Sequence, residues 1–190
     1  MAARNVLRTY RIPGVLFKNP TNCDAGIDSS GDFAATMGTR LGIHENISCS
    51  ISLTKVPLRS KTKGMDYDDL ETYRAASIAC FLRDMDPDAF VSIFGSTAFV
   101  TTTASTEGLL TLNGRECGTF MSANSFKLLL APRDPEVFPG VLFYNAIATI
   151  EPTPTEWGLD KSWGNIVVFK ALPDATNRFI QKGRLQDFTL

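Results

Sequence analysis

Hydrophobic and polar residues alternate most regularly over residues 47–54. The apolar positions are Ile47, Cys49, Ile51 and Leu53, and the polar ones between them are Ser48, Ser50, Ser52 and Thr54. Because successive side chains of a strand point to opposite faces, this period of two predicts a strand with one apolar face and one face of small hydroxyl groups. The hydroxyl face carries no charge, so it tolerates water or a passing polyanion without binding it tightly.

Residues 75–82, Ala-Ala-Ser-Ile-Ala-Cys-Phe-Leu, are apolar or small at every position. This pattern is typical of a strand that is buried on both faces. The same letters allow a helix over residues 69–83, since the apolar residues also recur at helical spacing. We favour the strand and keep the helix as the alternative.

A short helix is predicted at residues 86–95. Asp86 suits the N-cap, Pro87 suits the first helical position, and Gly95 suits the left-handed residue that ends a helix. A helix of about two turns is too short to be stable alone. We therefore expect it to pack on an apolar surface.

Further strands are predicted on both sides of these segments. They lie at residues 97–103, at 109–112 before an Asn113–Gly114 hairpin turn, and at 126–130, 141–150 and 166–172. Residues 10–17 fit an edge strand interrupted at Pro13, and residues 19–40 fit a long loop. Trp157 and Trp163 are expected to be core or interface anchors. Residues 176–190 are basic with little pattern, so we expect a C-terminal tail.

Charge is concentrated at residues 55–71, where a basic block is followed directly by an acidic block. Such a segment is either a solvated loop or a projecting arm that docks on a neighbouring copy. In the second case the subunit interface includes Lys55, Arg59, Lys61, Lys63, Met65, Asp66, Tyr67, Asp68 and Asp69. Exposed ion pairs are too weak to order the arm alone. We therefore expect it to be irregular in the free subunit and ordered by strand pairing with a neighbour.

The composition is that of a single globular domain of 190 residues, with 44% hydrophobic residues and a net charge of -1. This charge gives no general attraction to nucleic acid or to anionic membranes. No apolar run approaches the length of about 18 residues that a membrane span needs. The first residues lack the apolar segment of a secretory signal, so we expect a cytoplasmic origin.

Candidate chemistry is sparse. The four cysteines, at 23, 49, 80 and 117, form no C-x-x-C pair, and His44 is the single histidine. This spacing argues against a zinc site, and Cys49 and Cys80 are expected to be buried free thiols. His44 is expected in a surface loop just before a strand, and no phosphate-binding glycine loop is encoded. We therefore expect no catalytic residue, no cofactor, no metal and no enzymatic activity.

Residues 24–28, Asp-Ala-Gly-Ile-Asp, resemble the first short motif of the dUTP-hydrolysing family. The likeness covers five residues only. The catalytic segment of that family, which carries the carboxylate that activates water, and its serine-bearing phosphate loop are both absent. A dUTP-hydrolase-like enzyme is therefore the least favoured alternative, and Asp24, Asp28 and Asp32 fit turns better than a calcium loop.

The order of features over residues 40–175 resembles that of bacteriophage tail tube (major tail) proteins and the related tubes of contractile tails and secretion systems. A strand at residues 47–53 leads into a long arm that ends near residue 66. A second strand, an acidic turn at residues 84–88 and a short helix follow. The segment Asn165-Ile-Val-Val-Phe-Lys-Ala-Leu-Pro-Asp is similar to the closing strand of such tubes.

This resemblance implies a mainly β, α+β subunit with one short helix, built as a β-sandwich or split barrel. Such subunits assemble into rings, usually hexameric, that stack into the hollow virion tail tube through which DNA passes. The implied partners are other copies of the chain and other tail proteins, with no membrane and no specific DNA binding. Ser48, Ser50 and Ser52 are candidates for the lumen face. A terminator or distal-tail protein that stops at one ring is the main alternative.

Overall fold

The computed structural model of the chain describes residues 4–11, 14–23, 33, 35–41, 44–59, 66–82, 93, 99–101, 110–112, 121–151 and 165–190. The strands are β1 (Arg4–Arg11), β2 (Gly14–Lys18), β3 (Thr39–Arg40), β4 (His44–Arg59), β5 (Asp66–Leu82), β6 (Phe99–Thr101), β7 (Leu110–Leu112), β8 (Phe126–Pro132), β9 (Gly140–Glu151), β10 (Asn165–Leu172) and β11 (Ile180–Gly183). Three 3-10 helices accompany them, η1 (Ala35–Met37), η2 (Met121–Asn124) and η3 (Leu185–Asp187).

Nine of these strands form one antiparallel sheet. Eight follow each other in the order β1-β4-β5-β10-β9-β8-β2-β3, and β11 pairs with β9 beside the end of β10. β6 and β7 form a separate antiparallel pair. Among the described residues the sheet is not closed, because β1 and β3 each have one neighbour. The mainly β class is confirmed, whereas a sandwich or split barrel stays a prediction.

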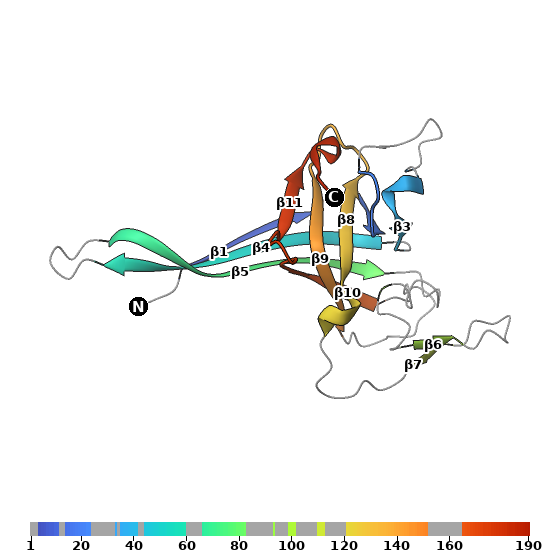
Figure 1. Cartoon of the computed structure of the whole chain (residues 1–190), viewed down its shortest axis with the longest axis horizontal. Helices are drawn as coiled ribbons and strands as arrows, with labels where there is room; N and C mark the ends of the chain where they lie inside the picture. Colours follow the sequence, from blue (N-terminus) through green and yellow to red (C-terminus); the bar gives the residue numbers. More distant parts are fainter. Residues whose placement is uncertain are drawn as a thin grey trace.

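The sheet contains two sets of strands that cross each other (Figure 1). β4 and β5 run along the long axis of the molecule, while β8, β9 and β11 run across it. β10 connects the two sets, because it pairs with β5 through residues 165–170 and with β9 through residues 166–172. Side chains from both sets share one hydrophobic cluster, the inner cluster, which includes Cys49, Ile78, Leu130, Phe143 and Phe169.

Residues 75–82 belong to a strand and not to a helix, since β5 pairs with β4 on one side and with β10 on the other. The side chains of Ala76, Ile78, Cys80 and Leu82 are at most 4% exposed. The residues between them are half-buried. The preferred interpretation is therefore confirmed, although the face opposite the inner cluster is less completely covered than the core face.

β9 changes part-way along its length which residues face the inner cluster. It contributes Val141 and Phe143 near its start but Ala146 and Ala148 further on. The change from odd to even positions occurs where Phe126 and Leu128 of β8 pair with β9 residues that are three apart, Ala146 and Phe143. An extra residue in one strand reverses the alternation beyond it. This bulge keeps small alanines beside β10.

A second hydrophobic cluster, the outer cluster, covers the opposite face of β2, β8 and β9. Leu185 is buried in it, and Phe188 and Leu190 pack against it. The hydroxyl group of Tyr144 in β9 donates a hydrogen bond to the backbone oxygen of Thr189, at 3.1 Å. The expectation of a patternless tail at residues 176–190 is therefore wrong, because this segment forms β11 and η3 and covers the sheet.

The N-terminal strand expected over residues 10–17 is in fact two strands. β1 is at an edge of the sheet, but β2, which covers most of the expected strand, is internal, between β8 and β3, so the expected edge position is wrong for it. Pro13 lies outside the described residues. Gly14 permits the close pairing of β2 with β8, since a Cβ atom there would lie 2.6 Å from the backbone oxygen of Ala131.

Several predicted features lie outside the described residues. They are most of the helix at 86–95, the Asn113–Gly114 turn, Trp157 and Trp163. Ile93 is the described part of that helix, and it has a helical backbone and a side chain buried in the inner cluster. The predicted strands at residues 97–103 and 109–112 contain β6 and β7. These two pair with each other, so the partner of β7 is the strand before it in the chain.

Candidate functional site: a hairpin arm and an uncharged sheet face

The arm predicted at residues 55–71 is a β-hairpin (Figure 1). Among the described residues, β1 borders β4 over residues 48–55, and β10 borders β5 over residues 77–82. Beyond these limits β4 and β5 pair with each other, as far as Arg59 and Asp66. The two strands extend well past the rest of the sheet, so the arm is a projecting two-stranded ribbon.

Pairing within one chain corrects the expectation that the arm is irregular until another copy supplies a strand. β4 and β5 provide each other's backbone hydrogen-bond partners, as an antiparallel ladder does. Pro57 is part of this ladder, opposite Asp69. The sequence suggests a loop here, because proline cannot donate to a ladder and charge runs are common in solvated segments.

The basic and acidic blocks stand opposite each other in the register of the hairpin. Lys55 is paired with Glu71, and Arg59 is paired with Asp66. Opposite charges at directly paired positions favour a given register of two strands. Part of the charge pattern is thus explained by the hairpin itself, without a second copy.

Two acidic residues of the arm have no such counterpart. Asp68 stands opposite Leu58 and Asp69 stands opposite Pro57. Tyr67 lies at the irregularity where the register shifts between Leu58 and Arg59. Asp68 and Asp69 are therefore the acidic residues in the described part of the arm that stand opposite an uncharged residue of the paired strand.

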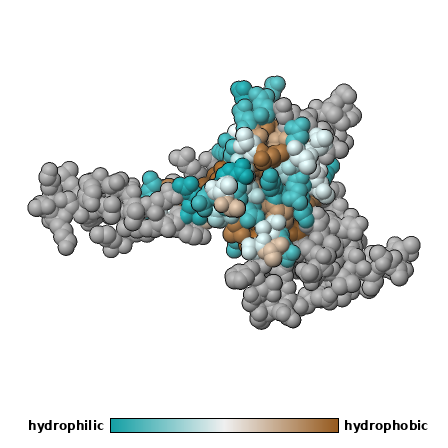
Figure 2. All heavy atoms as spheres, viewed as in Figure 1, coloured by the Kyte–Doolittle hydropathy of each residue, from teal (hydrophilic) through white to brown (hydrophobic). Residues whose placement is uncertain are grey.

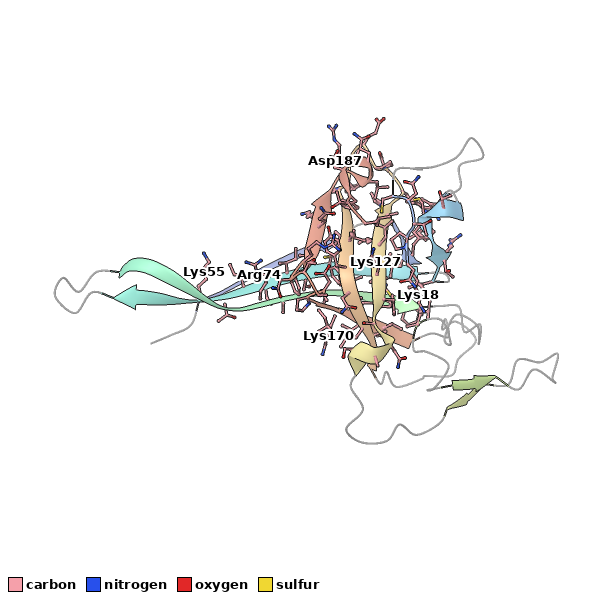
Figure 3. All side chains as sticks on the ribbon, in the orientation of Figure 1. Lys18, Lys55, Arg74, Lys127, Lys170 and Asp187 are labelled. Carbon is pink, nitrogen blue, oxygen red and sulfur yellow. The ribbon has the colours of Figure 1, made fainter. Side chains whose placement is uncertain are left out.

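The base of the arm carries two cations, Lys55 and Arg74 (Figure 3). The side chain of Arg74 is exposed and that of Lys55 is half-buried. The other predicted interface residues, Lys61, Lys63 and Met65, lie outside the described residues. Arg74 was not predicted as a site residue, because it precedes an apolar strand and is isolated in the sequence from the two charge blocks.

Ser48, Ser50 and Ser52 lie on the face of β4 that is turned away from the inner cluster. Ile47 and Cys49, at the alternate positions, are buried in that cluster, whereas the three serines are half-buried. The two faces predicted from the period of two are therefore present, one apolar and one of small hydroxyl groups.

β5 continues this face with residues of similar size. In the register of the two strands, Ser48, Ser50 and Ser52 are paired with Ala79, Ser77 and Ala75. The hydroxyl oxygens of Ser48 and Ser52 lie 3.5 Å from the backbone oxygens of Ala79 and Ala75, at the long limit of a hydrogen bond. We call these six residues the serine face, which is small and uncharged across two adjacent strands.

Cations border the serine face. Lys170 of β10 is exposed and is paired with Ser77, and Arg11 of β1 is paired with Ser48. Figure 3 shows Lys170 below the plane of the long strands. Lys170 was not predicted as a site residue, because β10 has the composition of a buried strand. Lys170 lies between Phe169 and Ala171, which are buried, and a single charged residue within an apolar run was the signal that this position faces away from the core.

Besides the short edge of β3, the sheet has two long edges with no neighbouring strand among the described residues. One is the free edge of β1, which pairs with β4 on its other side. The other is the edge of β5 over residues 66–73, which pairs with β4 alone. We call them the β1 edge and the arm edge. Unpaired strand edges are templates for pairing with another chain.

The described residues carry little reactive chemistry. Cys49 and Cys80 are free and buried, as predicted. Burial raises the pKa of Cys49 to about 11, against a smaller opposing effect of Lys182, and raises the pKa of Cys80 to about 12. These thiols therefore stay protonated and are poor nucleophiles near neutral pH.

The remaining candidate ligands are scattered. His44 is the first residue of β4, paired with Leu82, and does not precede the strand as expected. Cys117 and the aspartates at 24, 28 and 32 lie outside the described residues. Within the described part of the chain no group of three or more His, Cys, Asp or Glu residues is arranged to hold a metal ion.

The sequence matches no protein-family model and no curated protein. In the part of the chain that the structure describes, no helix has the length and apolar character needed to cross a membrane. Hydrophilic residues cover the end of the molecule where β11 and the C-terminus lie, with hydrophobic ones visible between them (Figure 2). The arm, the serine face and the two open edges are therefore the features from which a function is inferred.

Proposed function

We propose that this chain is a structural subunit that assembles with other copies into rings, which stack into a hollow tube of the kind found in bacteriophage tails. The observation that carries the proposal is the serine face, a small and uncharged surface of β4 and β5 that lies between β1 and β10, in a sheet with two open edges. The wall of the tube is formed by these strands and their neighbours β1 and β10. The subunit is then a sandwich or part of a larger barrel.

Assembly explains why the two edges are left open. Monomeric proteins usually protect strand edges, because unpaired N–H and C=O groups invite aggregation. Pairing with neighbouring copies satisfies these groups, and a closed barrel removes the edges altogether. A head-to-tail contact that repeats by rotation generates a ring.

The serine face suits the lumen of a tube that passes DNA. Each Lys or Arg contact with a phosphate group releases counterions, so several such contacts hold DNA tightly at physiological salt. Ser48, Ser50 and Ser52 and the residues paired with them in β5 carry no charge. Two basic residues, Arg11 and Lys170, are paired with Ser48 and Ser77 at the margins of this face. In this proposal the chain acts in the virion tail, contacts other tail proteins, and has no catalytic role.

Electron microscopy of the purified chain tests the proposal. Over a range of protein concentrations at low salt, we expect hollow rings or tubes, with sedimentation velocity showing species far larger than a 20.8 kDa monomer. Single rings that never stack would favour a terminator or distal-tail component. Dispersed monomers at every concentration and salt would contradict both forms of the proposal.

A further inference from the structure

The two open edges carry opposite charges. β1 contains three arginines, Arg4, Arg8 and Arg11, and no acidic residue. Residues 66–73 of β5 contain three aspartates and one glutamate and no basic residue. β1 is eight residues long, and the arm edge has the same length. The β1 edge is thus a basic strand and the arm edge an acidic one.

In the register of one chain, the three arginines of β1 and two of the four acidic residues of the arm edge stand opposite residues that are not of opposite charge. β4 lies between β1 and β5, so the basic and acidic strands are not neighbours. Arg4 stands opposite Lys55, a like charge, and Arg8 stands opposite Ile51. On the arm, Asp68 and Asp69 stand opposite uncharged residues.

We infer that the β1 edge of one copy pairs with the arm edge of the next copy, and that their opposite charges select this head-to-tail contact. The inference rests on the proposed assembly and identifies the two surfaces that make it. Backbone hydrogen bonds between the strands hold the contact, and the charges choose the partner. Like charges opposed across a strand pair are unfavourable.

The strand directions fit a ring. β1 is antiparallel to β4 and β4 is antiparallel to β5, so β1 and β5 run in the same direction. Rotation about an axis near the strand direction preserves that direction, so the arm edge of one copy and β1 of the next form a parallel pair. The ring therefore uses one parallel ladder per subunit contact.

The position of the arm edge avoids a clash and adds a stagger. β10 occupies the edge of β5 over residues 77–82, which leaves residues 66–73 for an incoming strand. In its own chain β1 borders residues 48–55 of β4, whereas the arm edge borders β4 further out, at residues 54–59. The contact consequently shifts each copy along the strand direction, and closed barrels require such a shift between strands.

Symmetric dimers are disfavoured by the same charges. A two-fold contact between two β1 edges would oppose arginines with arginines, and one between two arm edges would oppose carboxylates with carboxylates. A contact between copies through β3, at the other end of the sheet, would be weak, because β3 has two residues. The head-to-tail contact is left as the one that matches charge and length.

Two reversals of charge test the inference. The β1 variant carries Arg4→Glu and Arg8→Glu, and the arm variant carries Asp68→Lys and Asp69→Lys. None of these changes removes an opposite-charge pair in the register of the chain itself. Each variant alone should lose assembly in about 50 mM salt, where exposed charges act over long distances. An equimolar mixture of the two should regain it, because in a ring in which the two variants alternate, positions 4 and 8 of each copy are opposite in charge to positions 68 and 69 of its neighbour.

A chain that carries all four changes separates the head-to-tail contact from a symmetric one. It should assemble alone, since the two changed positions of its β1 edge are acidic and the two changed positions of its arm edge are basic. A symmetric contact would oppose like charges in this chain as in the wild type, and would produce only dimers in the mixture. A matched control for the β1 variant, Arg133→Glu with Arg184→Glu, makes the same net charge change as that variant at two exposed positions elsewhere and should assemble like the wild type.

The outcomes distinguish this inference from the proposed function. If the wild type never assembles, both fail. If the wild type assembles and the β1 variant assembles equally well, the edge contact is wrong and the proposed function stands. Circular dichroism checks that each variant is folded. If a reversed variant does not fold, Arg4→Gln with Arg8→Gln should still weaken assembly, and wild-type assembly should weaken between about 50 and about 500 mM salt; insensitivity to both would overturn the inference.

Discussion

Phe169 of β10 holds the two crossing sets of strands together. Its side chain is fully buried in the inner cluster. In register it stands between Ile78 of β5 and Ala148 of β9. Its ring contacts the ring of Phe126 in β8 edge-on, with centroids 6.2 Å apart and planes at 79°. One side chain therefore packs against elements from both sets.

We expect Phe169→Ala to lower the free energy of unfolding by about 3–5 kcal/mol, the range for truncating a buried phenylalanine. Globular proteins are stable by about 5–15 kcal/mol, so the variant should remain folded at room temperature. For a chain of this size each kcal/mol corresponds to about 2–4 °C, so Tm should fall by roughly 6–20 °C. The loss includes the aromatic contact with Phe126, because both rings are in one cluster.

Urea and thermal unfolding followed by circular dichroism measure this loss. The protein is kept below the concentration at which it assembles, since association would add apparent stability. Val137→Ala is the control, because Val137 is 66% exposed and its truncation should change stability by no more than about 0.5 kcal/mol. If Phe169→Ala costs less than about 1 kcal/mol, the two sets of strands do not share a packed core at this residue.

Two further predictions concern the outer cluster and the buried thiols. Gly140→Ala should destabilise the chain by about 1–3 kcal/mol in thermal unfolding, because the added Cβ would lie 2.5 Å from Cδ2 of Leu185; an unchanged Tm would mean that the C-terminal segment moves aside freely. At pH 8 a thiol reagent should leave Cys49 and Cys80 unmodified in the native chain and modify both after unfolding, since burial shields them and raises the pKa of each. Rapid native labelling in peptide mapping would contradict their burial.

The strands that could be predicted from the sequence are those in which one buried face imposes an alternation of apolar and other residues. β4 and β5 follow this rule near the inner cluster, where Cys49 and Ile78 are paired and both buried. β9 and β10 were predicted from their apolar composition, although the bulge in β9 was not. Local period is a direct result of burial on a sheet face, so it can be seen without knowing which strands are neighbours.

The C-terminal segment could not be predicted in this way. Leu185, Phe188 and Leu190 contact the outer cluster from a 3-10 helix and extended chain, which impose no regular period. The hydrogen bond of Tyr144 to Thr189 joins residues 45 positions apart. Such contacts depend on tertiary placement, and a pattern confined to 15 residues of basic and polar character does not reveal them.

Only part of the candidate site could be predicted, because the rest depends on contacts between distant parts of the chain. The serine face follows from the alternation in β4 alone, because burial of Ile47 and Cys49 turns the residues between them outward. The open edges depend on the order of strands in the sheet, which is a non-local property. The β1 edge is basic in the sequence, but nothing local indicates that its free side is opposite in charge to the free side of the arm.

The register of the hairpin also decides which residues can report on assembly. Arg59 and Asp66 are paired in one chain, and so are Lys55 and Glu71. Reversing Arg59 to Glu would oppose two acids within the same hairpin and would destabilise the arm before any second copy is involved. Loss of assembly in that variant would therefore not identify an interface. Asp68 avoids this ambiguity, because its paired residue is uncharged and its reversal changes what the arm presents to a neighbour.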